Sequence, residues 1–429
     1  MDGFTSADAF EVRWVPKAEG GNLPVLFHTD PYIPVRLPFH YLALHAEEIY
    51  AESTQGQHAR TLKALYQYCY CVARIELDTI LASGQALSSD DVFGFSRWLR
   101  NGRLDPVKLV GRIGPTAEGT PIVRRSTVLA YLKSIKTYLL WAADTFSASG
   151  GSPDEVKKQL EGARARIERM FSRLKMPSID PVLKGFDKDQ MYRLRSVARP
   201  GSRMNPFKDE AVQWRNWCIL EILSDSGLRR GELMSALSSD KPSIHNSHKW
   251  FVRRRPPDPK DPRVPRPAVK TQERDIQLLP RHTDILKRYV DKYRFVFTTD
   301  ERGNKKKAKP SHDFLFISTE DGAPLSLDAI NKILKALGNA AFPNGDVVVH
   351  PHLLRNTFCN EFMEHAVDVE GRSVSAAQEE LRRLCGWTLK SEMPTLYARK
   401  WGQEAADEAQ RRTLLRREEQ ARGLSTKGE

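Results

Sequence analysis

Apolar residues recur at helical spacing through much of the first half of the chain. They do so in residues 58–75, and a second helix is predicted after the acidic run Ser89–Asp91. A third helix is expected to start after a cap at Ser126, and a basic helix is expected at 155–175. The pattern therefore predicts a helical unit over residues 47–177.

Two segments lack this periodicity and divide the chain. Residues 1–46 are interrupted by prolines, so we expect a weakly structured N-terminal extension with one short strand at Phe10–Trp14. Residues 176–185 contain two prolines and a glycine without an apolar face, which is typical of a linker.

A second unit with both helices and strands is predicted beyond the linker. Asp187 and Gln190 have the spacing of a capping box at a helix start. A helix over 209–224 is expected to end at Gly227, since glycine readily adopts the left-handed conformation there. Six prolines in residues 256–267 exclude a ladder strand and predict an extended basic loop. Strands are predicted at Trp250–Arg253, Arg274–Leu279 and Phe314–Ser318, followed by helices to near the end of the chain.

Composition narrows the class of protein. The 429 residues suit two to three domains, and a hydrophobic content of 40% excludes global disorder. No stretch approaches the roughly 18 apolar residues of a membrane span, and the first residues lack a signal-peptide pattern. The five scattered cysteines indicate buried thiols in a reducing compartment, and the lone pair Cys69 and Cys71 does not predict a zinc site. We therefore expect a cytoplasmic protein without membrane contact or bound metal.

The formal net charge of +13 is concentrated in three segments. Residues 121–175 hold eleven basic and five acidic side chains, residues 252–274 eight and three, and residues 299–312 five and two. Solvated surface would explain any single run, but three separate basic segments favour a nucleic acid partner. The side chains predicted to contact it are Arg124, Arg125, Lys133, Lys136, Arg253, Arg254, Arg255, Lys305, Lys306 and Lys307.

Four short motifs follow one another in the second unit. They are SDSGLRRGEL (224–233), VKTQERDIQLLP (269–280), HPHLLRNTF (350–358) and LCGWTLKSEMPTLYARKW (384–401). Together they contain the groups that phosphoryl transfer on a DNA diester requires. Its transition state spreads negative charge over the non-bridging oxygens, which the guanidinium groups of Arg229 and Arg355 could hold.

The same motifs contain candidates for the nucleophile and the proton donors. Tyr397 could form a covalent phosphotyrosyl bond, and Lys270 could protonate the leaving 5′ oxygen. His352 could accept a proton or act as a further donor, and Trp387 could donate its indole N–H. Each residue taken singly has a simpler explanation, such as a helix cap, a surface cation or packing. The interpretation therefore depends on the ordered set.

The ordered set resembles the tyrosine recombinase (phage integrase) family. The motifs carry the resemblance over residues 186–400, whereas residues 47–177 match the family's helical core-binding domain by position and pattern only. The resemblance implies that Arg229, Lys270, His352, Arg355 and Trp387 activate the phosphate, with Tyr397 as nucleophile and Glu232 in an acidic supporting position. Lys260 competes with Lys270, which we favour because Lys-Thr precedes a predicted strand.

The resemblance also implies the fold class and its division into domains. We expect a mainly α protein with a small antiparallel β-sheet in a mixed α/β catalytic domain. The expected order is an N-terminal extension (1–46), a helical, SAM-like core-binding domain that binds DNA (47–177), the catalytic domain (178–401) and a C-terminal tail (402–429). The tail is neutral and amphipathic; we hypothesise that it docks on a neighbouring protomer, with packing in cis as the alternative.

The implied activity is that of a site-specific DNA recombinase or integrase. It would cleave and rejoin strands through a 3′-phosphotyrosyl intermediate, without ATP, metal or another cofactor. The implied partner is double-stranded DNA with specific sites, bound as a homo-tetramer on two duplexes by a chain that is a monomer or dimer when free. Accessory proteins could take part, and a nucleoid-associated location would follow. The alternatives are a type IB topoisomerase-like relaxing enzyme and a catalytically inactive DNA-binding regulator.

Overall fold

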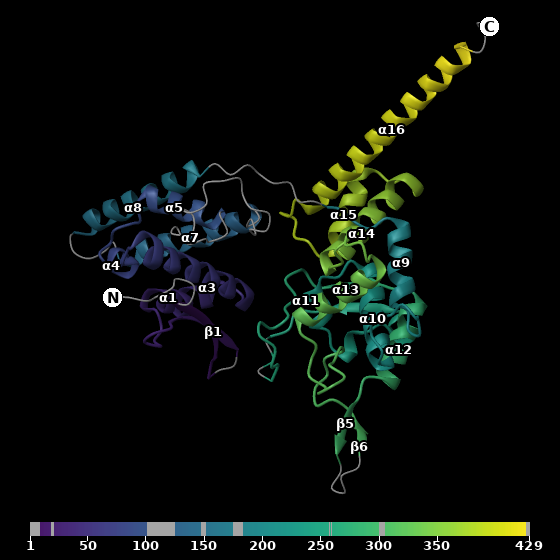
Figure 1. Cartoon of the computed structure of the whole chain (residues 1–429), viewed down its shortest axis with the longest axis horizontal. Coiled ribbons are helices and arrows are strands. Elements are labelled where there is room, and N and C mark those ends of the chain that lie inside the picture. Colours follow the sequence, from purple (N-terminus) through teal and green to yellow (C-terminus); the bar gives the residue numbers. More distant parts are fainter. Residues whose placement is uncertain are drawn as a thin grey trace. The chain divides into compact units, whose positions relative to one another are not determined.

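The computed structural model describes residues 9–18, 21–100, 125–146, 152–174, 183–256, 258, 260–299 and 305–425. Contacts group the chain into two compact units. The first unit comprises Met1–Asp180 with Val264–Arg266, and the second comprises Pro181–Arg263 with Pro267–Glu429 (Figure 1). The predicted linker at 176–185 lies mostly outside the described residues.

The first unit begins with a β-hairpin. Strands β1 (Phe10–Pro16) and β2 (Asn22–His28) pair antiparallel, and Phe10, Val25 and Leu26 are buried in the core of the unit. The strand expected at Phe10–Trp14 is therefore present, but the expectation that residues 1–46 form a weakly structured extension is wrong for residues 10–46. The proline in β2 concealed the second strand, although proline is tolerated at the edge of a small sheet.

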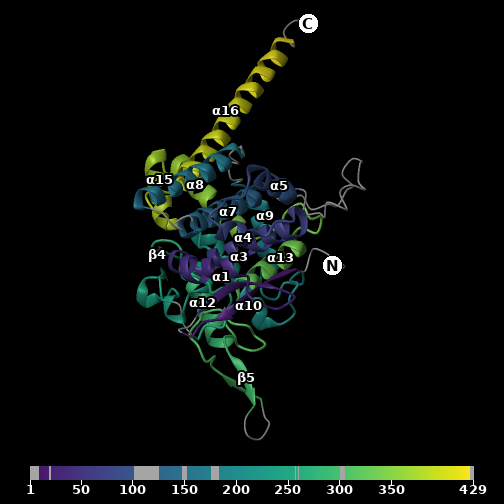
Figure 2. The same cartoon turned by 90° about the vertical axis from the view of Figure 1, so that its left-hand side faces the viewer.

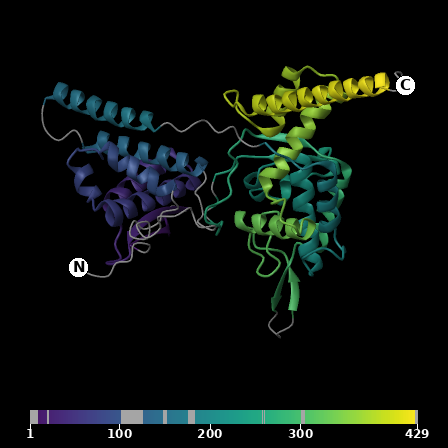
Figure 3. The same ribbon diagram turned by 45° about the horizontal axis from the view of Figure 1, so that its top comes forward.

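Helices complete the first unit. A buried hydrogen bond of 2.8 Å joins the hydroxyls of Tyr66 on α3 (Glu52–Gln67) and Tyr138 on α7 (Arg125–Phe146). The last helix lies along the one before it and is the long blue helix of Figure 3. A capping box of Ser152 and Glu155 starts it. The elements are α1 (Arg36–His40), a π-helical turn (Tyr41–Ala46), α2 (Glu47–Ile49), α3 (Glu52–Gln67), a second π-helical turn (Tyr68–Ala73), α4 (Leu77–Ala82), α5 (Ser89–Arg100), α7 (Arg125–Phe146) and α8 (Pro153–Arg173).

The second unit is a helical core with two small hairpins. Asp187 and Gln190 form the expected capping box, and the helix predicted over 209–224 ends at Gly227 with φ of +61°. The helices are α9 (Lys188–Ala198), α10 (Glu210–Ser226), α11 (Arg230–Met234), α12 (Pro280–Lys292), α13 (Leu327–Ala341), α14 (Pro351–Glu364), α15 (Val374–Cys385) and α16 (Met393–Ser425), with short 3₁₀ turns at Ser238–Asp240 and Ile244–Asn246 and a π-helical turn at His365–Val369. The mainly α fold with small antiparallel sheets is confirmed.

The strands of the second unit only partly follow the sequence prediction. β3 (Lys249–Val252) and β4 (Arg274–Gln277) pair antiparallel on either side of the proline-rich loop, as expected. The prediction of a strand at Phe314–Ser318 is wrong, because this buried apolar segment makes only isolated bridges. The basic segment 299–312 contributes a strand to a hairpin that the sequence did not predict, β5 (Val296–Thr299) with β6 (Lys305–Ala308).

The final helix, α16, runs far beyond the other helices of the second unit (Figures 1 and 2). The predicted boundary at 401/402 falls inside this continuous helix. Leu414 and Leu415 are about half exposed, at 54% and 49%. Docking of the tail on another protomer stays a prediction. Among the described helices, none has the combination of length and apolar character that a membrane span needs.

Candidate active site

The turn after α10 brings Arg229 close to Arg355. Gly227 ends the helix in the left-handed region, and a Cβ there would lie 2.4 Å from the Phe358 ring, so only glycine fits. Arg355, on α14, donates a hydrogen bond to the Gly227 carbonyl. The turn that precedes Arg229 therefore also binds the second arginine of the predicted pair.

The C-terminal end of α15 holds both arginines. The carbonyl oxygen of Cys385 accepts hydrogen bonds from Arg355 Nη2 at 3.1 Å and from Arg229 Nη1 at 3.4 Å. Arg355 is only 2% exposed, whereas the Arg229 side chain is 37% exposed. Burial and the neighbouring Arg355 charge lower the pKa of Arg229. Two guanidinium groups held side by side can bind an anion, and Arg229 is the more solvent-accessible of the two.

A buried carboxylate balances part of this positive charge. Glu232 has no exposed side-chain surface and binds Arg274 Nη2 at 2.8 Å, Thr271 Oγ1 at 2.5 Å and the backbone N–H of Arg229 at 3.0 Å. Burial alone would raise the pKa of Glu232, but Arg274 and these hydrogen bonds outweigh it and lower the pKa. The supporting role of Glu232 in catalysis stays a prediction. Arg274 was predicted only as the start of a strand, and its place in the sequence carries no signal that it is buried.

The segment containing Lys270 is tied to the same end of α15. Gln272 donates its N–H to the Gly386 carbonyl at 3.0 Å, and Arg274 Nε donates to the Leu384 carbonyl at 2.6 Å. Lys270 is exposed just before these contacts. Lys260 lies in the proline-rich loop, where its backbone N–H binds Asp258 Oδ1. The contacts thus favour Lys270 over Lys260 as the lysine of the site.

A pocket of about 330 Å³ lies beside the two arginines, lined by residues of α11, α13 and α14 and of the segments that precede α11 and α14. Arg229, His352 and Arg355 all line it, so three of the predicted catalytic residues come together. Partial burial, followed by the charge of Arg355, lowers the pKa of His352, which favours a neutral imidazole able to accept a proton near pH 7. The complete lining is Arg229, Arg230, Asn331, His350, Pro351, His352 and Arg355.

Tyr397 and Trp387 lie beside this pocket but do not line it. Tyr397 is 1% exposed and stacks on Trp387 with ring centroids 5.8 Å apart, and the Arg355 guanidinium lies 5.0 Å from the Trp387 ring centroid. The Tyr397 hydroxyl donates a 2.7 Å hydrogen bond to Asn356 Oδ1, and burial raises its pKa above the ordinary value. Trp387 therefore contacts both the arginine and the tyrosine, and the tyrosine hydroxyl is bonded to Asn356 and is not part of the pocket lining.

Most of the predicted DNA-contacting cations with described side chains are engaged within the protein. Arg253 binds Asp275 at 2.7 Å, Arg254 Nε binds the Thr271 carbonyl and Arg255 forms a two-pronged pair with Asp240. Lys136 pairs with Glu168, Lys307 lies over the Phe295 ring, Lys306 also has interactions, and Lys133 is exposed. Arg124 and the side chains of Arg125 and Lys305 lie outside the described part.

The structure reveals a cluster of arginines that the sequence prediction missed. On α8, Arg166, Arg169 and Arg173 line a pocket of about 630 Å³ beside residues 84–89. Arg173 also lines a neighbouring pocket of about 320 Å³ together with Arg97 and Arg100 of α5. Three of these arginines are spaced at i, i+3 and i+7, which places them on one helix face and could have identified them. We call these five residues the α5/α8 arginine cluster.

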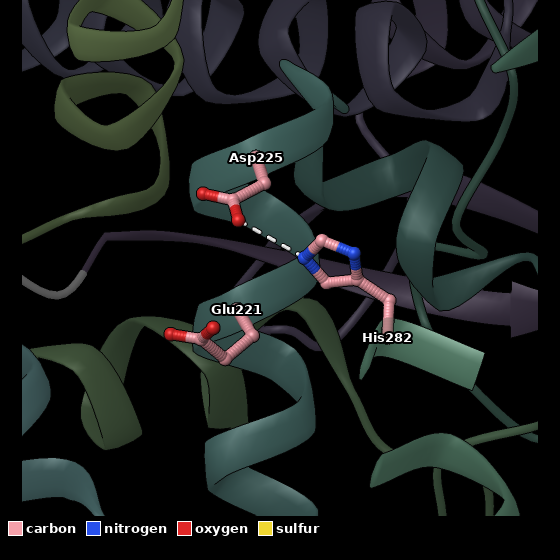
Figure 4. A group of neighbouring side chains, drawn as sticks. All are labelled: Glu221, Asp225 and His282. Carbon is pink, nitrogen blue, oxygen red and sulfur yellow. Dashed lines mark hydrogen bonds and ion pairs between the residues drawn. The ribbon is translucent and has the colours of Figure 1, made fainter. Parts of the chain in front are cut away.

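A second group of titratable residues, Glu221, Asp225 and His282, has the composition of a metal site (Figure 4). His282 Nε2 lies 3.0 Å from Asp225 Oδ2, and Asp225 also pairs with Arg195 and Arg281. Burial would raise the pKa of Asp225, but the hydrogen bond from His282 and the Arg195 charge lower it. Two guanidinium groups already neutralise these carboxylates and would repel a cation. We therefore interpret the group as an ion-pair cluster that joins α9, α10 and α12.

The second unit is similar in sequence to a known protein family. Residues 186–372 match the phage integrase family, which confirms the resemblance over this segment. The matched segment includes Arg229, Lys270, His352 and Arg355 and ends before Trp387 and Tyr397. The roles of the last two residues therefore stay predictions from the motif at 384–401.

Three solved structures are similar to this chain at low sequence identity. The XerA recombinase is 17% identical, with 84% of this chain and 92% of that chain covered and a TM-score of 0.33. The Tn1549 transposon integrase in complex with transposon right end DNA is 16% identical, with 75% and 92% covered and a TM-score of 0.38. The XerH site-specific recombinase bound to difH substrate is 13% identical, with 84% and 88% covered and a TM-score of 0.36. No curated protein matches the sequence significantly.

Proposed function

We propose that this protein is a site-specific tyrosine recombinase that cleaves and rejoins DNA through a 3′-phosphotyrosyl intermediate. The observation that carries the proposal is the meeting of Arg229 and Arg355 on the Cys385 carbonyl, at the edge of a pocket and next to Tyr397. A scissile phosphate bound in this pocket would neutralise the positive charges of Arg229 and Arg355, which otherwise repel each other. The developing negative charge of the transition state would strengthen both contacts.

The reaction divides into two balanced transfers. The Tyr397 oxygen attacks phosphorus as its proton passes to His352 or to solvent, and the bond from phosphorus to the 5′ oxygen breaks. Lys270 protonates the departing 5′ oxygen, which leaves a free hydroxyl. In the reverse sense, a 5′ hydroxyl of a partner strand attacks the phosphotyrosyl bond and releases Tyr397. The covalent bond conserves the energy of the diester, so the scheme requires neither ATP nor a metal.

The scheme requires a movement of Tyr397. Its hydroxyl is bonded to Asn356 and does not line the pocket, so it has to leave this position before it can reach the phosphate. Burial has raised the pKa of Tyr397, and approach to the two arginines would lower it because cations favour the phenolate. The described conformation is thus interpreted as the state before cleavage.

DNA binding is proposed to involve both units. In the first unit, the α5/α8 arginine cluster offers a basic surface, with Lys133 exposed on α7. In the second, Lys306 and Lys307 lie on strand β6. These cations would bind phosphates irrespective of sequence and make the affinity depend on salt. We retain the tetramer on two duplexes, the trans docking of α16, accessory proteins and a nucleoid location as parts of this proposal.

The buried state of Tyr397 also favours a second candidate, a DNA-binding regulator without strand cleavage. One experiment separates the two. Duplexes bearing a nick near the recognition site lose a short fragment on cleavage and so trap the covalent complex. Wild-type protein and the control variant Tyr192→Phe, at an exposed tyrosine, should both form it. Tyr397→Phe should form none. Absence of a covalent complex with the wild type, or equal trapping by Tyr397→Phe, would refute the proposed chemistry.

A second assay, with supercoiled plasmid as the substrate, distinguishes recombination from DNA relaxation. A type IB topoisomerase-like enzyme would relax a supercoiled plasmid that carries no recognition site. A recombinase would instead yield joined products only when two duplexes with sites are present. Relaxation without such sites would overturn the assignment as a site-specific recombinase.

A further inference from the structure

A short segment of the second unit is fastened to α14 directly beside Tyr397. This segment, Leu183–Phe186, consists of the described last three residues of the predicted linker at 176–185 and the residue that follows it. Asn360 Nδ2 donates to the Leu183 carbonyl at 3.0 Å, and the N–H of Phe186 donates to Thr357 Oγ1 at 2.8 Å. The segment is thus held at both of its ends by side chains on the helix that carries Arg355.

Close packing reinforces these hydrogen bonds. A Cβ on Gly185 would lie 2.9 Å from Thr357 Cα and 3.0 Å from Asn360 Nδ2. Because the nearest of these atoms belongs to helix backbone, it cannot move aside cheaply. The segment can lie against α14 only with glycine at this position, so any larger residue would push it away from the helix.

Asn356 connects this segment to the tyrosine. Its amide is 3% exposed; Oδ1 accepts from the Tyr397 hydroxyl at 2.7 Å and Nδ2 donates to the Lys184 carbonyl at 3.2 Å. The reversed amide would set its oxygen against the Lys184 carbonyl oxygen, two acceptors without a proton between them. The carbonyl of the segment therefore orients the amide, and the amide in turn binds the hydroxyl.

We propose that Asn356 is a positioning residue that holds Tyr397 away from the phosphate pocket, and that the Leu183–Phe186 segment controls this hold through the Lys184 carbonyl. Detachment of the segment from α14 frees the amide to turn, which removes the Asn356 acceptor and leaves the Cys359 thiol as the other side chain that interacts with the hydroxyl. The inference rests on the proposed function in that Tyr397 is the nucleophile. It assigns a role to the position that directly follows the second arginine of the site.

The test measures the reactivity of Tyr397 in the absence of DNA. The full chain is treated with tetranitromethane, and nitration at each tyrosine is quantified by mass spectrometry. Tyr192, 76% exposed, and Tyr289, fully buried, serve as internal references. Two variants weaken the hold by different routes, Asn356→Ala at the amide and Gly185→Ala at the segment. The matched control Gly402→Ala adds the same methyl group to the helix of Tyr397, where nothing lies within 4 Å.

In the wild type and in Gly402→Ala, Tyr397 should be as protected as Tyr289. Both Asn356→Ala and Gly185→Ala should raise nitration of Tyr397 about tenfold, the effect of losing roughly 1.4 kcal/mol of restraint, a magnitude usual for a buried donor left without its acceptor. Tyr289 should not change. Unchanged protection of Tyr397 in Asn356→Ala would overturn the proposal, and so would a rise shared with Tyr289 in both variants. A rise in Asn356→Ala alone would overturn control by the segment.

Because nitration needs no DNA, its result is independent of the proposed recombinase activity. If the wild type traps no covalent complex on nicked DNA, the proposed function fails while the nitration pattern can still show the restraint. If trapping succeeds and the nitration pattern does not change among the variants, only the positioning role of Asn356 fails.

Discussion

Glu232→Gln replaces the buried carboxylate at the centre of the arginine network by an amide of nearly the same shape. The two carboxylate oxygens accept from the backbone N–H of Arg229, from Thr271 Oγ1 and from both Nη atoms of Arg274. An amide offers only one oxygen. Whichever oxygen becomes the NH₂ group, some of these donors then face another donor, and the Arg274 guanidinium loses its buried counter-charge.

The expected cost follows from the burial of the pair. The Glu232 side chain has no exposed surface and that of Arg274 is 8% exposed, so solvent cannot replace the lost carboxylate. Removing one partner of a buried ion pair typically destabilises a protein by about 3–5 kcal/mol. Urea denaturation of the full chain, followed by tryptophan fluorescence, should show this loss in the transition of the second unit. The control Glu379→Gln, at a carboxylate 45% exposed beside Arg382, should change stability by less than about 1 kcal/mol.

The effect should also depend on pH in a defined direction. The pKa of Glu232 is lowered in the folded state, so its contribution to stability is present above the unfolded pKa, about 4.3, and is lost as the pH falls through the folded value. The difference between wild type and Glu232→Gln should therefore be constant near pH 7 and shrink below about pH 4. A loss no larger than that of Glu379→Gln, or one that persists in acid, would refute this account of the network.

Three further outcomes follow from the structure. Gly227→Ala should lower the free energy of unfolding by about 2 kcal/mol or more, because alanine is strained in the left-handed backbone conformation and its Cβ would clash with the Phe358 ring. Thermal unfolding measures this loss, and an unchanged midpoint temperature would contradict it. Arg173→Ala should lower the magnitude of the slope of log affinity for DNA against log salt by about one, measured by fluorescence anisotropy titrations. The control Arg164→Ala removes a cation already paired with Asp144 and should leave the slope nearly unchanged. Equal slopes for the two variants would exclude a phosphate contact of Arg173. If His352 accepts the proton, its lowered pKa should place the acid limb of the covalent-trapping rate below pH 6.5, and His352→Gln should abolish that limb; a limb that survives the substitution would exclude this role.

Local features of the fold could be predicted from the sequence because their causes are local. The capping box of Asp187 and Gln190 and the helix end at Gly227 depend on a few neighbouring residues, and both were predicted correctly. The hairpin of residues 10–28 and the isolated bridges at Phe314–Ser318 were not, since pairing depends on partners elsewhere in the chain. A run of apolar residues indicates that a segment is buried, but it does not reveal which other segment its backbone will hydrogen-bond to.

The sequence by itself determined the resemblance to the phage integrase family and the set of candidate site residues, because residue type and order are properties of the chain. Only the tertiary structure decided how these side chains meet. The Cys385 carbonyl brings Arg229 and Arg355 together across more than a hundred residues of sequence. The bond from Tyr397 to Asn356 likewise joins two helices and withdraws the candidate nucleophile. Hydrogen bonds of this kind depend on distance and direction in space, which residue spacing along a chain does not encode.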